Sequence, residues 1–180
     1  AFLLLAAGCA GGASVAPGYP AVDRLVPPGG VATRGERMVR AIRALEADPR
    51  RPDAAALRGD IEAWMNADPF SPAGKDVRIA PDWAYLEPVA RNAVPHADLL
   101  AFHYLAGLAA FDVEHPDRMG DAEADVLPAI DSVVPVNRRL LEKEPEARNP
   151  FLDGLAERAD RGALAEHVAE VRKKKNANRP

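Results

Sequence analysis

Apolar side chains return every three or four positions along most of this chain, from residue 33 onward. An α-helix has 3.6 residues per turn, so this spacing collects apolar side chains on one face that must pack against another element. Residues 97–114 carry apolar side chains on nearly every side, which is typical of a helix surrounded by other helices. Residues 76–79 alternate briefly, but one short strand does not stand alone. The sequence therefore predicts an all-α fold.

Local signals mark where these helices begin and end. Thr33 followed by Glu36 is a capping box, and Asp48-Pro49 ends the helix that it begins. Asn149-Pro150 places a capping side chain before a proline at the first helical position. We expect six to seven short helices, packed as antiparallel helical hairpins around a central apolar helix at about 97–114.

Most of the 17 prolines fall at predicted helix boundaries, but two interrupt a periodic stretch that starts at residue 126. Pro128 and Pro135 fit a helix if Asp125 or Ser132 caps a start and the proline lies in the first turn, and otherwise predict a kink.

Three helix ends in the sequence carry a proline: Asp48-Pro49, Asp68-Pro69 and His115-Pro116. Short helix pairs that end in this way look like tetratricopeptide repeats. The defining Trp, Gly, Tyr and Ala positions of that family do not recur here at its 34-residue period. The resemblance is confined to helix-pair style and implies an array of helical hairpins.

An apolar run at residues 2–7 precedes the one cysteine of the chain, Cys9. The run is far shorter than the roughly 20 apolar residues that span a bilayer, and it has the form of a secretory signal. Ala6-Ala7-Gly8-Cys9 resembles the bacterial lipobox, although that family usually has Leu where this chain has Ala6. The resemblance implies that Cys9 is the lipid attachment site. The residue after the lipidated cysteine would be Ala10 and not Asp. By resemblance to the sorting of Gram-negative lipoproteins, this implies the outer membrane.

Two other interpretations of the N-terminus remain open. It is an ordinary export signal, cleaved near Gly8 or Ala10 with Cys9 incidental, or it is an N-terminal hairpin element buried in the fold.

The chain divides into four parts, and its length suits one domain with a hydrophobic core. Residues 1–9 are predicted to be a truncated export or lipoprotein signal. Residues 10–32 are rich in glycine and proline and predict a flexible tether. Residues 33–172 form a single helical domain, and residues 173–180 a basic polar tail.

The sequence contains no strong signature of catalysis. It has no His-Glu-x-x-His run, no glycine-rich phosphate loop and no Gly-x-Ser-x-Gly elbow. The acidic residues between 117 and 125 lack the spacing of a calcium loop. The net charge of −4 argues against a nucleic-acid partner. We therefore predict no catalytic residue, no metal site and no cofactor.

His103 is the histidine that deserves a functional hypothesis, because it lies inside the most apolar stretch of the chain. A buried imidazole acts as a base or ligand when a carboxylate reaches it. Otherwise it is neutral and hydrogen-bonded to one backbone carbonyl or hydroxyl. Tyr104 and Trp83 complete the candidate pocket.

These observations favour an exported lipoprotein of the bacterial cell envelope, facing the periplasm from the outer membrane. In this interpretation the chain is a helical interaction or scaffold module without catalytic activity. Its expected partners are the membrane, through the lipid anchor, and another envelope protein. The alternative is a small-ligand-binding protein or enzyme with a buried site around His103.

Overall fold

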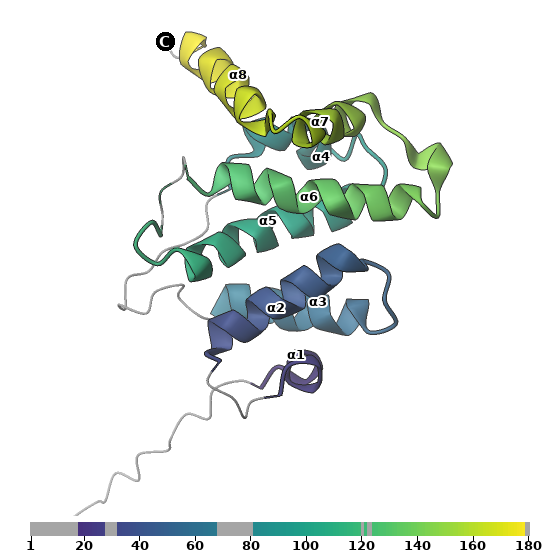
Figure 1. Ribbon diagram of the computed structural model, residues 1–180, viewed down its shortest axis with the longest axis vertical. Coiled ribbons are helices and arrows are strands. Elements are labelled where there is room, and N and C mark those ends of the chain that lie inside the picture. Colours follow the sequence, from purple (N-terminus) through teal and green to yellow (C-terminus); the bar gives the residue numbers. More distant parts are fainter. Residues whose placement is uncertain (1–17, 28–31, 68–80, 120, 122–123, 179–180) are drawn as a thin grey trace, which may run out of the picture.

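A computed structural model describes residues 18–27, 32–67, 81–119, 121 and 124–178, and these residues are all helical or connecting (Figure 1). The described ranges contain no strand, which confirms the all-α prediction. Eight α-helices lie in them, where six to seven were expected. They are α1 (Pro20–Leu25), α2 (Arg34–Ala47), α3 (Ala54–Ala67), α4 (Glu87–Ala90), α5 (Ala97–Glu114), α6 (Val126–Leu141), α7 (Pro150–Asp160) and α8 (Leu164–Ala177). Two short 3-10 helices, η1 (Trp83–Leu86) and η2 (Pro145–Ala147), complete the set.

The helices stack in layers that follow the chain, except that η1 and α4, which precede α5 in the sequence, lie at the end of the stack with α7 and α8 (Figure 1). Helix α1 contacts α2 and α3, and α2 in turn contacts α5 and α6. Helix α6 then contacts α7, α8 and η1 on its other side. Helices α1 and α8 therefore lie at opposite ends of the stack (Figure 1).

Helix α5 is the central element, with the bounds that the sequence predicts. One side of α5 contributes Leu100, Tyr104 and Leu108 to a core shared with α6, α7 and α8. The opposite side contributes Phe102 and Ala109 to a second core shared with α1, α2 and α3. Two cores on opposite faces of one helix explain why its sequence is apolar all round.

Helices α5 and α6 lie close together at Gly107, which has no side chain to hold them apart. A Cβ added at Gly107 would lie 2.9 Å from the Cα of Ala129 and 2.9 Å from the Cβ of Ser132. Helix α6 runs unbroken, with Pro135 exposed inside it. Asp125 stands at the N-cap position of α6 but its side chain makes no capping hydrogen bond. Asp125 thus occupies the predicted N-cap position and Pro128 lies in the first turn of α6, but the side-chain cap does not form, and Ser132 lies inside the helix.

The capping predictions at two other helix starts are confirmed. The Thr33 side chain accepts a hydrogen bond from the Glu36 backbone N–H, and the Glu36 carboxylate accepts one from the Thr33 N–H. The Asn149 side chain accepts from the Phe151 N–H, with Pro150 next to it.

Within the predicted flexible tether, residues 10–32, Pro20–Leu25 is instead a packed helix, α1. An Asp60 carboxylate oxygen on α3 accepts hydrogen bonds from the Ala21 N–H at 2.6 Å and the Val22 N–H at 3.0 Å. Val22 is fully buried, and Tyr19 beside it is buried as well. The tether prediction is therefore wrong for this segment, because a carboxylate from a distant helix satisfies the N–H groups at the start of α1.

Helix α8 continues to Ala177 and so includes most of the predicted basic tail, residues 173–180. Lysines near the end of a helix interact favourably with its negative dipole end, which stabilises the last turns. Lys175 also pairs with Asp82 and lies 5.9 Å from the ring centre of Tyr85. The tail prediction is therefore wrong for residues 173–177. No helix in the described ranges combines the length and apolar character needed to cross a bilayer.

Candidate functional site

Trp83 and Tyr104, two members of the predicted pocket, do lie together. Their ring centres are 5.3 Å apart at an interplanar angle of 48°. Tyr104 is fully buried, and its hydroxyl donates a hydrogen bond to the backbone carbonyl of Asp82 at 3.1 Å. Burial, followed by the Asp82 and Asp125 carboxylates, raises the pKa of Tyr104. A phenol in this setting stays neutral and fixes η1 to α5.

His103, the third member, lies on a different side of α5, because successive residues of a helix are about 100° apart. Its side chain is fully buried, and neither ring nitrogen has a hydrogen-bond partner among the described residues. Burial, and then the positive charge of Arg58 on α3, lowers the pKa of His103 to about 3. The expected hydrogen bond to a carbonyl or hydroxyl is therefore wrong, and no described carboxylate is bonded to the ring.

The spacing along α5 places His103 on the flank that also carries Gly107 and Glu114. Gly107 touches α6, and Glu114 reaches α2 through Arg43. His103 thus lies along the seam where α2, α5 and α6 meet. Its nearest aromatic neighbour in this region is Phe102, whose ring centre is 5.2 Å away in an edge-on arrangement.

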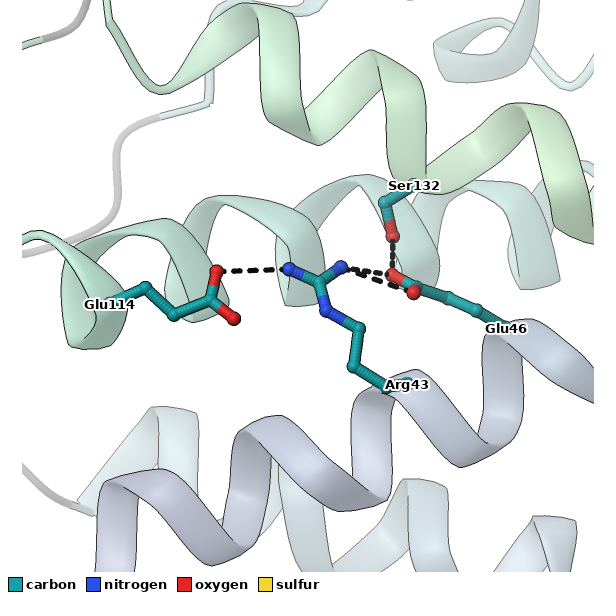
Figure 2. A network of polar contacts seen from close by, with 4 residues as sticks. All are labelled: Arg43, Glu46, Glu114 and Ser132. Carbon is teal, nitrogen blue, oxygen red and sulfur yellow. Dashed lines mark hydrogen bonds and ion pairs between the residues drawn. The ribbon is translucent and has the colours of Figure 1, made fainter.

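Four polar side chains bridge the three helices of this seam (Figure 2). Arg43 donates to the two carboxylate oxygens of Glu46 at 2.8 and 3.1 Å, and to Glu114 at 3.0 Å. Ser132 on α6 donates to the same Glu46 carboxylate. Burial alone would lower the pKa of Arg43, but the two carboxylates outweigh it, so that pKa is raised. The four residues form a clamp, with Glu46 at its centre and only 12% exposed.

Sequence reasoning missed this clamp. The Arg43 and Glu46 pair, three residues apart on one helix, is the part of it with a sequence signal. Glu114 and Ser132 belong to other helices, so no spacing within one helix links them to Arg43 and Glu46.

A second polar group lies where α5 ends and α6 begins. Asp125 has its pKa raised to about 6, first by burial and then by the neighbouring carboxylate of Asp112, with Asp121 adding to the effect. Asp112 is almost fully buried. In the described part of the chain, no three His, Cys, Asp or Glu side chains are arranged to hold a metal ion.

A groove of about 390 Å³ lies between the end of α2 and the end of α6. Its charged lining mixes signs, because Arg139 pairs with Glu142 and Arg50 pairs with Glu144 just beyond it. The groove therefore offers no surface of a single charge for an ionic ligand.

The predicted lipid attachment site, Cys9, lies outside the described residues. No protein-family model, curated protein or solved structure matches this chain. Functional inference therefore depends on the chain's own residues and their arrangement.

Proposed function

We propose that this chain is a lipid-anchored helical module of the bacterial cell envelope that acts through contact with another envelope protein. The apolar run before Cys9 and its resemblance to a lipobox support the anchor and the location. A covalent lipid would tether the folded part to the membrane without any spanning helix.

The main structural support for this proposal is the order of the helix layers, from α1 at one end of the stack to α8 at the other. Residues 10–18 separate Cys9 from Tyr19, and a fully extended chain of that length spans about 35 Å at most. Helix α1 follows at once and is held to α3 by the Asp60 carboxylate. An anchor at Cys9 would thus hold the α1 end of the stack near the membrane. The α7 and α8 end would face away from it, toward a partner (Figure 1).

The side chains of the candidate pocket have structural roles and so favour a scaffold module over the alternative of a buried site around His103. The Tyr104 hydroxyl is occupied by the Asp82 carbonyl, and its ring packs against Trp83. The His103 imidazole is enclosed, without the bonded carboxylate that would make it a strong base. These groups hold helices together.

The anchor is tested by expressing the protein from its full gene in a bacterium and labelling the cells with radioactive palmitate. We expect label and an acyl mass increment on the wild-type protein, and neither on the Cys9→Ser variant. A processed protein with a free thiol at Cys9 would overturn the anchor.

The partner is tested separately with a photo-crosslinking amino acid in living cells. Ala165 and Ala169 are exposed on α8, whereas Ala55 is exposed on α3 at the opposite end of the stack. We expect one and the same envelope protein to be captured from both α8 positions and not from position 55. Capture from position 55 alone, or from no position, would contradict the proposed orientation and the interaction.

A further inference from the structure

The described helices form two packed units that meet where α2 contacts α5 and α6. The N-terminal unit consists of α1, α2 and α3, which contact one another and share one core. The remaining helices share the other core with α6 at its centre. The two units are joined where small residues of α5, such as Ala106 and Ala110, face the N-terminal unit. Because the cores lie on opposite faces of α5, the units have separate sets of apolar contacts.

The imidazole of His103 lies in this junction with no hydrogen bond on either nitrogen. Its side chain is fully buried, and Arg58 from α3 is the charged group that acts on it. A proton on the closed imidazole would therefore be both desolvated and repelled. Separation of the N-terminal unit from α5 would give the ring access to water.

We propose that acid opens the molecule between the N-terminal unit and α5, because the opened His103 takes up a proton that the closed form excludes. This inference is independent of the lipid anchor and concerns the fold itself.

The other polar groups at the junction come from three helices, and the charged ones among them from α2 and α5. Arg43 and Glu46 on α2 and Glu114 on α5 are paired with one another, and Ser132 of α6 is neutral. The Arg43 guanidinium is thus paired with both carboxylates, and its pair with Glu114 holds α2 and α5 together in the closed form. His103, by contrast, has no charged partner that would favour its protonated form while the junction is closed.

The size of the effect follows from proton linkage. An exposed imidazole has a pKa of about 6.5, whereas the closed His103 binds a proton only near pH 3. Lowering the pH from 7.5 to 4.5 therefore raises the open population relative to the closed one roughly 100-fold.

The chain provides a probe in each unit. Trp64 on α3 is buried in the core of the N-terminal unit, and Trp83 packs against the other core. In the Trp83→Phe protein only Trp64 remains, so its fluorescence reports the core of the N-terminal unit. In the Trp64→Phe protein only Trp83 remains, so its fluorescence reports the core around α6. Each is unfolded with urea at pH 7.5 and at pH 4.5. We expect coincident midpoints at pH 7.5 and, at pH 4.5, a lower midpoint for Trp64 than for Trp83.

His103→Leu in both single-tryptophan backgrounds is the matched control, and there the two midpoints should coincide at both pH values. Nuclear magnetic resonance of the wild-type imidazole supplies a test without a core substitution. We expect the His103 ring signals of the closed form to stay unshifted from pH 8 to pH 5. Coincident midpoints at pH 4.5 with His103 present, or ring signals that titrate near pH 6.5 in the folded protein, would overturn the proposal.

Discussion

Replacing Gly107 with alanine tests the close packing of α5 on α6. The new methyl group would lie 2.9 Å from the Ala129 Cα and 2.9 Å from the Ser132 Cβ, which real Cβ atoms do not tolerate. The first of these is a backbone atom, so a rotamer change cannot relieve the contact and the two helices must move apart. Such overpacking costs about 1–3 kcal/mol, while alanine returns up to about 1 kcal/mol over glycine within a helix. We expect Gly107→Ala to lower the free energy of unfolding by about 1–2 kcal/mol.

The assay is urea unfolding followed by far-ultraviolet circular dichroism. Gly59→Ala on α3 and Gly154→Ala on α7 are matched controls, because a Cβ at either position meets nothing within 4 Å. Both controls should gain about 0.5–1 kcal/mol from the lower entropy of the unfolded chain. If Gly107→Ala raised the free energy of unfolding as much as these two control substitutions do, the close packing of α5 on α6 would be refuted.

Three further substitutions probe the polar contacts of the fold by urea unfolding. Asp60→Ala should lower the free energy of unfolding by about 1.5–3 kcal/mol, because two N–H groups of α1 lose a charged acceptor. It should also speed proteolysis within residues 19–27, and an unchanged cleavage rate would contradict the packing of α1 on α3. Asn149→Ala should lose about 1 kcal/mol through its helix cap, and an unaltered midpoint would contradict that cap. Asp125 has a folded pKa of about 6 against 3.8 unfolded, so folding disfavours its charge and the wild type loses stability as the pH rises through this window. Above pH 7, the free energy of unfolding of Asp125→Asn should therefore exceed that of the wild type by about 1 kcal/mol, after allowance for the partial exposure of Asp125. Below pH 4 the two proteins should be equally stable. A difference that does not change with pH would show that the charge of Asp125 is not its cause.

The features that sequence alone predicts here are those that depend on neighbours within one helix. The capping box at Thr33 and the cap at Asn149 involve residues two or three positions apart. The bounds of α5 follow from an apolar run between two polar ends. In each case the deciding interaction is local, so the sequence pattern contains all of it.

The features that were missed depend on residues far apart in the chain. Helix α1 needs Asp60, which is 39 positions from Ala21, to satisfy its first N–H groups. The clamp needs Ser132, which is 86 positions from Glu46. Composition around residues 10–32 resembles a linker, and nothing within that segment shows that a distant carboxylate fixes part of it. Periodicity indicates which face of a helix is buried but not which helix covers it.

His103 shows why burial and chemical role need separate arguments. Its place in an apolar run predicts burial, and the side chain is fully buried. The run says nothing of its hydrogen-bond partners, which are absent on both nitrogens among the described residues. A buried polar group without a partner costs about 1–3 kcal/mol, so a leucine at this position would favour stability at neutral pH. Leucine would also remove the imidazole that takes up a proton when the junction opens. The two residues therefore differ in more than stability: His103 makes the contact between the two units depend on pH, and leucine would not.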